Sequence, residues 1–107
     1  MSALISITQE LDNNILRIDN LGKVLVDNDS LVKDVTETIT TMIDRGLLIG
    51  GEIIKVNGPL TVHMAFVLAH KLAPLFETVA VYDLRLKNKY VVAIVNGGKF
   101  KVGDLID

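Results

Sequence analysis

The chain contains no cysteine and no long apolar run. The first absence excludes a disulfide framework, a thiol nucleophile and a thiolate zinc site. The second excludes a transmembrane helix, because such a helix needs about 18 or more consecutive apolar residues. The first residues, Met1 to Leu4, also lack the charged segment that precedes the apolar stretch of a secretory signal. We therefore expect a cytoplasmic protein with no membrane partner.

Positive charge is sparse and unevenly distributed along the chain. Residues 1–54 hold four basic and nine acidic side chains, a balance of −5, whereas residues 55–107 hold seven basic and four acidic ones, a balance of +3. Scattered cations of this kind do not form the dense basic stripe of a duplex-binding protein, so we expect no duplex DNA partner. The second half either offers a mildly positive face to an anionic ligand or simply exposes solvated lysines.

The length of 107 residues suits one domain, because a chain this short has no room for a second core. Half of the residues are apolar and 22% are charged, a balance that is typical of a compact chain and not of a disordered one. The sequence contains no internal repeat, linker or low-complexity segment. Residues 1–107 are therefore expected to form a single domain.

Apolar periodicity predicts an alternating order of strands and helices. The predicted elements are, by residue number, strands at 3–8 and 15–18, a loop at 20–28, a helix that starts at 29 or 30 and ends near 46, a strand at 51–56, a helix that starts near 59 and ends near 74, strands at 78–82 and 90–95, and a short apolar segment after 104. This order predicts right-handed crossovers and a mainly parallel centre, to which the flanking hairpins add antiparallel strands. The predicted fold class is α/β, a single Rossmann-like domain with a mixed sheet and two main helices.

Two predicted strand ends carry the candidate site residues, since ligands collect at the C-terminal ends of parallel strands in open α/β sheets. Asn57, Gly58 and Pro59 end one strand and open the second helix, whose free N–H groups suit a phosphate. Asp83 and Arg85 end the next strand and point the same way on an extended segment, where they orient a hydroxyl and neutralise a phosphoryl oxygen. The alternative is a strand-end salt bridge beside an ordinary glycine turn. The segment matches neither a Walker sequence nor a GxGxxG motif.

The chain has two histidines, His63 and His70, and both fall in the second predicted helix. Seven residues separate them, about 10 Å along a helix, which is too far for both to bind one metal ion directly. His63 lies one turn inside the helix and is the stronger candidate to contact a ligand or transfer a proton. The alternative for each is a half-buried structural histidine. No Ser/His/Asp arrangement indicates a hydrolytic triad.

The second half of the sequence resembles one known family. The matching stretches are Asn57-Gly58-Pro59-Leu60 with His63, Ala69-His70-Lys71, Val79-Ala80-Val81-Tyr82-Asp83 with Arg85, and Gly103-Asp104-Leu105-Ile106-Asp107. Together they resemble the small CRISPR-associated protein of the Csx series, third type, a distant member of the CRISPR-associated Rossmann-fold (CARF) superfamily. The motifs cover residues 57–107, whereas residues 1–56 match only in the order of their elements.

The resemblance implies a ring nuclease of type III CRISPR defence. Members of the family bind the second messenger cyclic tetraadenylate and linearise it, which switches the antiviral response off. They have also been regarded as manganese-dependent nucleases that act on RNA 3′ ends. The ligand is held between two dimers, so the resemblance implies a homodimer that forms a tetramer around cyclic tetraadenylate or short RNA, with Mn²⁺ as a cofactor.

The same resemblance assigns roles to individual positions. Asp83 and Arg85 match the active-site aspartate and arginine of the family, and Asn57 and Gly58 fall on its ligand-binding turn. The neighbouring motif residues Pro59, His63 and His70 are expected to contact the ligand as well.

One departure from the family pattern concerns proton transfer. The family carries a catalytic histidine two positions after its His-Lys pair, whereas here His70-Lys71 is followed by Leu72-Ala73-Pro74. No residue of this sequence is therefore assigned the role of general acid, which donates a proton to the leaving oxygen. Three functions stay open: a cyclic tetraadenylate phosphodiesterase, a binding or sensor module that only sequesters the ring, and an α/β domain unrelated to nucleotides.

Overall fold

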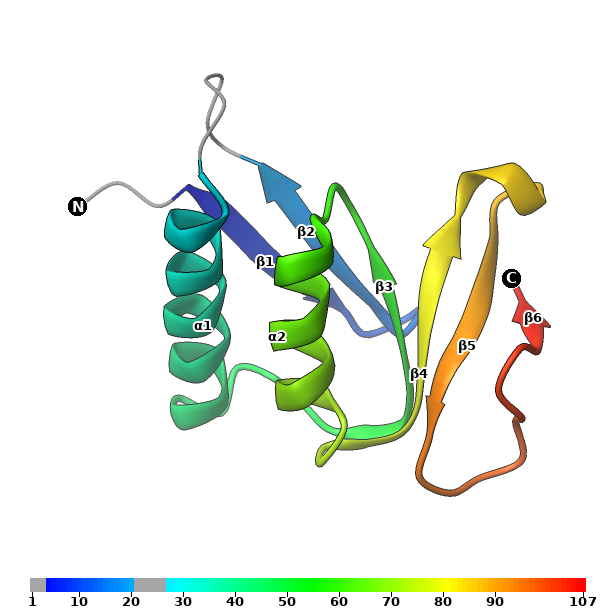
Figure 1. The fold of residues 1–107 in the computed structure, drawn as a ribbon. Coiled ribbons are helices and arrows are strands. Elements are labelled where there is room, and N and C mark those ends of the chain that lie inside the picture. The colour runs from blue at the N-terminus through cyan, green and yellow to red at the C-terminus, as the bar shows by residue number, and fades with distance from the viewer. Residues whose placement is uncertain (1–3, 21–26) are drawn as a thin grey trace.

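A computed structural model describes residues 4–20 and 27–107, which form one mixed sheet and two helices (Figure 1). The elements are β1 (Ile5–Glu10), β2 (Ile15–Asn20), α1 (Asn28–Asp44), β3 (Gly51–Asn57), α2 (Val62–Leu72), β4 (Phe76–Asp83), the short 3₁₀ turn η1 (Leu84–Leu86), β5 (Lys89–Val95) and β6 (Leu105–Ile106). Both helices lie on the same face of the sheet, and neither covers β5 or β6.

The strands lie in the sheet in the order of the sequence, from β1 to β6. The central strands β2, β3 and β4 are parallel, whereas β1–β2, β4–β5 and β5–β6 pair antiparallel. The predicted α/β class and parallel centre are thus confirmed. The two crossover connections, β2–α1–β3 and β3–α2–β4, move across the sheet in the same direction. Since such connections share the same right-handed sense, α1 and α2 lie on the same face of the sheet.

The first helix, α1, forms on the predicted apolar stripe. Leu31, Val35 and Ile39 are buried at helical spacing against the sheet. The helix starts slightly earlier than predicted, because its N-cap is Asp27, which makes no side-chain capping bond. Gly46 follows the helix in the left-handed conformation with φ 68°, as predicted for a residue that ends a helix.

The second helix, α2, begins at Val62, three residues later than Pro59. The reason is Thr61, whose Oγ1 accepts a hydrogen bond of 3.2 Å from the Met64 N–H and so caps the first turn. Pro59 therefore precedes the helix and does not occupy its first turn, which corrects the prediction. The helix ends at Leu72, close to the predicted end near residue 74. Ala73, the residue before Pro74, still has helical backbone angles (φ −54°, ψ −41°), so the end is better explained by Pro74 itself, which has no N–H to continue the helix.

Each face of the sheet carries an apolar core. The larger core lies beneath the helices, and its most deeply buried members include Ile5, Leu16, Ile18, Val35, Ile39, Ile54, Leu68 and Leu72. The smaller core lies on the helix-free face, where Ala80, Tyr90 and Val92 are buried beneath partly buried side chains of Ile15, Tyr82, Val95, Phe100 and Ile106. The sheet thus separates two layers, and the side on which a strand residue points decides which layer it joins.

The strand boundaries differ from the predicted ones by a few residues. The first strand lies at 5–10, and the fourth extends from 76 to 83. Ala3 of the predicted first strand, and residues 21–26 of the predicted loop, lie outside the described residues. No helix among the described residues is long and apolar enough to span a membrane.

Candidate functional site

The C-terminal ends of β3 and β4 lie side by side at one edge of the sheet. The parallel register pairs Val56 with Val81, so Asn57 and Asp83 follow this pair on neighbouring strands. The start of α2 lies at the same edge, because only residues 58–61 separate the helix from the end of β3. The two strand ends and the start of α2 therefore lie at the same edge of the sheet.

The turn between β3 and α2 requires glycine at position 58. Gly58 has φ 137°, a conformation that other residues rarely adopt. A β-carbon at this position would stand 2.0 Å from the carbonyl oxygen of Ile18 on β2. Gly58 is thus present because the turn packs directly on a neighbouring backbone, a cause that is independent of any ligand.

The N-terminus of α2 retains free hydrogen-bond donors. Thr61 accepts from Met64 through its hydroxyl and from Ala65 through its carbonyl. Among the described residues, the N–H groups of Val62 and His63 have no acceptor, as is usual for the first turn of a helix. Two donors and the positive end of the helix dipole therefore face outward at this edge.

Asp83 and Arg85 are held together by a turn. Asp83 ends β4 and its Oδ1 accepts a hydrogen bond of 2.9 Å from the backbone N–H of Arg85, which caps η1. The Arg85 Nε lies 3.7 Å from the same oxygen, and the Arg85 side chain is 91% exposed. Because Arg85 lies in η1, the two residues do not share the extended segment that we predicted. The capping bond nevertheless keeps the guanidinium beside the carboxylate. The strand-end salt bridge, which the sequence offered as the alternative interpretation, is therefore present in the structure.

The pleat of the sheet separates Asn57 from Asp83. Val56 and Val81 line a groove against α2, so the residues that follow them, Asn57 and Tyr82, point to the helix-free face. There the Asn57 Nδ2 donates a hydrogen bond of 2.8 Å to the hydroxyl of Tyr90. Asp83, one residue further along, returns to the face that carries the helices. The Asn57 amide and the Asp83 carboxylate therefore do not converge on one ligand atom.

Other polar contacts of the helix-free face are also satisfied. Arg17 Nε lies 2.6 Å from Glu10 Oε2, and this carboxylate raises the pKa of Arg17 above its ordinary value. The Lys55 ammonium donates to the backbone oxygen of Asp107 and lies 5.3 Å from the centre of the Tyr90 ring. Both of these cations are therefore paired with neighbouring groups of the protein, which is typical of residues that stabilise the fold.

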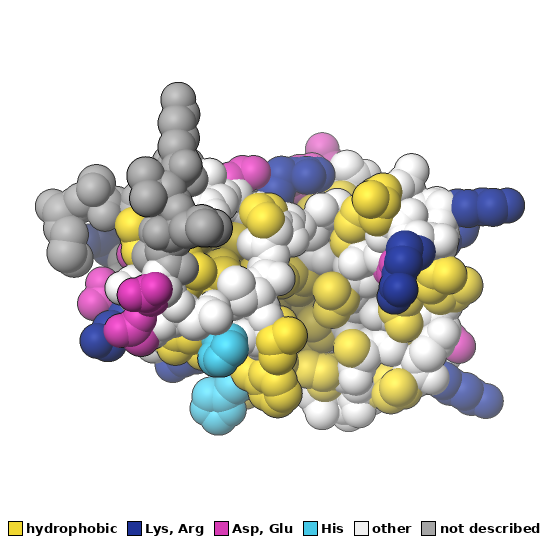
Figure 2. Space-filling view, turned by 45° about the horizontal axis from the view of Figure 1, so that its top comes forward, with side chains coloured by type: hydrophobic (Ala, Val, Ile, Leu, Met, Phe, Trp, Pro, Cys, Tyr) yellow, Lys and Arg dark blue, Asp and Glu magenta, His cyan; other side chains and the backbone are white. Residues whose placement is uncertain are grey.

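Both histidines are exposed on α2. Neither His63 nor His70 makes a hydrogen bond or ion pair with any other described residue. The expected alternative of a half-buried structural histidine is therefore wrong for both. Figure 2 shows the two histidine side chains together at one side of the molecule, beside a hollow around which hydrophobic side chains gather.

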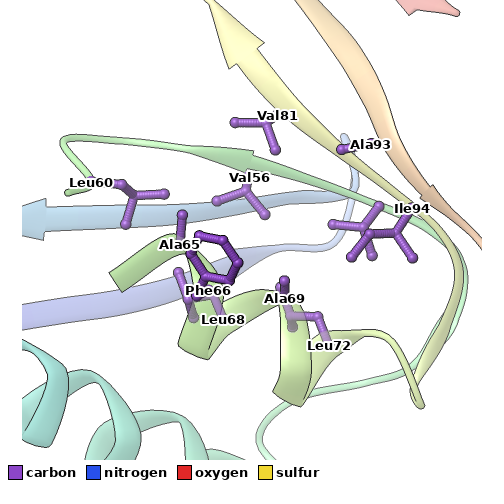
Figure 3. Close-up of a pocket in the computed structure, with 11 residues that line it drawn as sticks. Val56, Leu60, Ala65, Phe66, Leu68, Ala69, Leu72, Val81, Ala93 and Ile94 are labelled. Atoms are coloured by element: carbon purple, nitrogen blue, oxygen red, sulfur yellow. The ribbon is translucent and has the colours of Figure 1, made fainter. Parts of the chain in front are cut away.

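That hollow is an apolar groove of about 240 Å³ between α2 and strands β3, β4 and β5. Figure 3 shows its lining, which is Val56, Leu60, Ala65, Phe66, Leu68, Ala69, Leu72, Val79, Val81, Ala93 and Ile94. Phe66 lies on α2 among apolar residues at helical spacing, a pattern that favours burial, yet its side chain is 74% exposed. Val62, one turn earlier on α2, is 69% exposed. The spacing of four residues between Val62 and Phe66 is the sequence feature that could have indicated an exposed apolar surface on this helix.

The described residues do not gather a cation site. No group of three or more His, Asp or Glu side chains in the described part of the chain lies close enough to hold a metal ion. Asp83 offers one carboxylate, and its Oδ1 already accepts the Arg85 N–H. The described residues of a single chain therefore bring together fewer than three such donors at this edge of the sheet.

Comparison with known proteins gives no relative: no protein family, no curated protein and no solved structure matches this chain.

Proposed function

We propose that the chain is a CARF-like, Rossmann-like domain that binds cyclic tetraadenylate and cleaves it to linear oligoadenylate. The observation that carries this proposal is the pairing of Asp83 with an exposed Arg85 at the C-terminal end of β4. The start of α2, which offers two free N–H groups, lies at the same end of the sheet. The sequence resemblance of residues 57–107 to type III CRISPR ring nucleases supports the same assignment. The biological role that follows is to switch off an antiviral signal.

The groups at this edge suit a phosphodiester. The N–H groups of Val62 and His63 bind the oxygens of one phosphate at the positive end of α2. Arg85 binds the phosphate that reacts, because its guanidinium is permanently charged and, among the described residues, forms an ion pair with Asp83 alone. Asp83 orients the guanidinium through the shared turn.

The cleavage step is an in-line attack of a ribose 2′-oxygen on the adjacent phosphorus. The bond from phosphorus to the 5′-oxygen breaks, which leaves a 2′,3′-cyclic phosphate and a free 5′-hydroxyl. The 2′-hydroxyl loses a proton and the leaving oxygen gains one, so no further reactant is needed. Arg85 neutralises charge on the non-bridging oxygens, and binding of the neighbouring phosphates aligns the attacking oxygen. His63 lies in the first turn of α2, where the free N–H groups are, and we assign it as the side chain that transfers the proton.

A binding module that does not cleave the ring is the second candidate. Two observations favour this candidate. The Asp83 carboxylate already accepts a hydrogen bond from the Arg85 backbone, and the sequence lacks the catalytic histidine that the family carries two positions after its His-Lys pair. In this case Arg85 and the start of α2 hold phosphates without turnover. Binding assays alone do not separate the two candidates, whereas product analysis does.

The deciding experiment incubates the purified protein with labelled cyclic tetraadenylate, with and without manganese, and resolves ring from linear products while binding is recorded. Linear oligoadenylate is offered in parallel to detect activity on short RNA. Turnover by the natural sequence that is lost in Arg85→Ala supports the enzyme. The matched control is Arg45→Ala, which removes an exposed arginine after α1, and it should leave turnover unchanged.

Three results decide among the functions. Tight binding without linear product supports the module that sequesters the ring. Turnover that survives Arg85→Ala contradicts the site assignment. No binding and no turnover contradict both candidates and leave an α/β domain with another role.

A further inference from the structure

The groove beside α2 is an apolar surface that no part of the described chain covers. It lies on the helix-bearing face of the sheet, between α2 and strands β3, β4 and β5 (Figure 3). Phe66 stands at its border and is 74% exposed, whereas the other four aromatic side chains of the chain are buried or half-buried. An aromatic ring left in water forgoes the favourable free energy of its burial, which a bound ligand recovers.

The groove extends to the edge of the sheet that carries the candidate site. Val56 on β3 and Val81 on β4 both line it, and each lies within two residues of the end of its strand. Because side chains alternate along a strand, Asp83 lies on the same face as Val81 and next to this end of the groove. Leu60, in the turn before α2, also lines it. The apolar groove therefore adjoins the Arg85 guanidinium and the free N–H groups at the start of α2.

The size and chemistry of the groove suit one flat apolar group of a larger ligand. Its volume of about 240 Å³ lies below the roughly 300–1,000 Å³ of sites that enclose a whole small molecule. Its lining presents no polar surface, so a charged group has no partner inside it. The charges lie outside, where Arg85 and the N-terminus of α2 favour an anion. A nucleotide, which joins a flat ring to a phosphate, satisfies both parts of this surface.

We propose that the groove binds one adenine base of cyclic tetraadenylate, with Phe66 stacked against that base. The proposal rests on the proposed function and adds a base-binding subsite to it. Aromatic side chains stack on nucleobases because every base has a π face. His63 and Phe66 are three residues apart on α2, so they are neighbours on one face of the helix, about 5 Å apart along its axis. A base against Phe66 thus has its own ribose and phosphate toward His63 and the free N–H groups.

The groove recognises the base by stacking and not by hydrogen bonds. A lining without polar surface offers no partner to the ring nitrogen and amino group that distinguish adenine from hypoxanthine. The polar edge of the base therefore faces solvent at the open side of the groove. An apolar site of this kind discriminates poorly between rings of the same shape, so hypoxanthine should bind as adenine does.

Binding of labelled cyclic tetraadenylate tests the subsite on the natural sequence and four variants. Phe66→Ala removes the ring and should weaken binding about 10- to 100-fold, the usual loss for a stacked base. Ala93→Leu should also weaken binding, because it fills the hollow. Phe66→Tyr keeps a ring that stacks, and Leu11→Ala removes an exposed apolar side chain from the turn between β1 and β2; both should bind within about threefold of the natural sequence. All three positions are exposed, so the fold should be retained, which circular dichroism verifies.

Phe66→Trp gives a direct readout of stacking, since the chain has no tryptophan of its own. Stacking on adenine should quench the fluorescence of this single indole when the ring is added. Adenosine monophosphate and inosine monophosphate should quench it with dissociation constants within about threefold of each other. Leu11→Trp is the matched control and should not be quenched.

The outcomes separate this subsite from the function on which it rests, and because binding is measured, the test applies with or without turnover. Weaker binding by Phe66→Ala and Ala93→Leu, with binding kept in Phe66→Tyr and Leu11→Ala, supports the subsite. Ring binding that Phe66→Ala leaves unchanged overturns the subsite alone, as does equal quenching of Leu11→Trp. A preference of about 100-fold for adenosine monophosphate overturns recognition by stacking, because it requires hydrogen bonds to the base edge. No ring binding by the natural sequence overturns the proposed function and the subsite together.

Discussion

The side-chain amide of Asn57 donates a hydrogen bond of 2.8 Å to the hydroxyl oxygen of Tyr90 on the helix-free face of the sheet. The Tyr90 side chain is buried, so loss of either partner leaves a polar group without its hydrogen bond. We expect Asn57→Ala and Tyr90→Phe each to lower the free energy of unfolding by about 1 kcal/mol. The double variant should cost less than the sum of the two, because the partners share one bond.

Urea unfolding measures these differences, and binding of labelled cyclic tetraadenylate is measured on the same proteins. Because the amide points away from Asp83, folded Asn57→Ala should bind the ring as the natural sequence does. Strictly additive costs, or a large loss of ring binding in Asn57→Ala, would show that Asn57 acts elsewhere.

Two substitutions of Asp83 separate its structural role from its charge. Asp83→Ala removes the acceptor of the Arg85 N–H and should lower stability by about 1 kcal/mol, the usual cost of a lost cap. Asp83→Asn keeps an oxygen acceptor for this hydrogen bond and should lower stability by only a few tenths of a kcal/mol. If the carboxylate positions Arg85 by its charge, both variants lose turnover about 100-fold or more. Ring-cleavage assays and urea unfolding on the two proteins give the comparison, and full activity in Asp83→Asn would reduce Asp83 to a capping residue.

The order of elements was predictable because it depends on local patterns. Alternating apolar residues, the stripe that includes Leu31, Val35 and Ile39, and the break at Pro74 each indicate an element without reference to the rest of the chain. The parallel centre follows from that order. The start of α2 was misplaced because Pro59 and Thr61 both suit a helix start, and only the observed capping bond decides between them.

The composition of the site was less predictable, since it depends on which way each strand residue points. Asn57 and Asp83 lie close in the sheet register, yet one residue of offset places their side chains on opposite faces. The register also shifts between Val79 and Ala80, an irregularity that no local pattern indicates. The exposure of Phe66 depends in turn on the placement of α1 and α2, neither of which lies over β5, and this placement is a property of the whole fold.

Gly58→Ala should be among the most damaging single changes. The added β-carbon meets the backbone of Ile18 at 2.0 Å, and the φ of 137° is strained for alanine, so we expect a loss of about 3 kcal/mol or more. Gly51→Ala is the matched control, because a β-carbon there has nothing within 4 Å, and it should change stability by less than about 1 kcal/mol. Thermal and urea unfolding compare the two. Equal stability of both variants would contradict the close packing of the turn.

Lys89 should lower the pKa of the Asp107 carboxyl. The Lys89 ammonium donates a hydrogen bond to Asp107 Oδ1 and adds its charge, and both effects lower the pKa of Asp107 below its ordinary value. A carboxyl whose pKa is lowered in the folded state stabilises the fold when ionised. The contribution is therefore present at neutral pH and is lost as the pH falls through the lowered pKa.

An NMR titration of the Asp107 carboxyl carbon measures this shift. Lys89→Met should return the pKa toward its ordinary value, whereas Lys99→Met, which removes an exposed lysine from the loop after β5, should not. The same pKa in the natural sequence and in Lys89→Met would exclude the ion pair in solution.

Thr78→Val should stabilise the protein. Thr78 is fully buried in β4, and its hydroxyl has no hydrogen-bond partner among the described residues. A buried hydroxyl without a partner loses its bonds to water and gains nothing, whereas valine fills the same volume and suits a strand. We expect the free energy of unfolding to rise by about 1 kcal/mol. Thr8→Val, an exposed position on β1, is the matched control and should change it by less than about 0.5 kcal/mol. A loss of stability in Thr78→Val, measured by urea unfolding, would mean that the hydroxyl binds a buried water or a backbone group whose loss outweighs the gain.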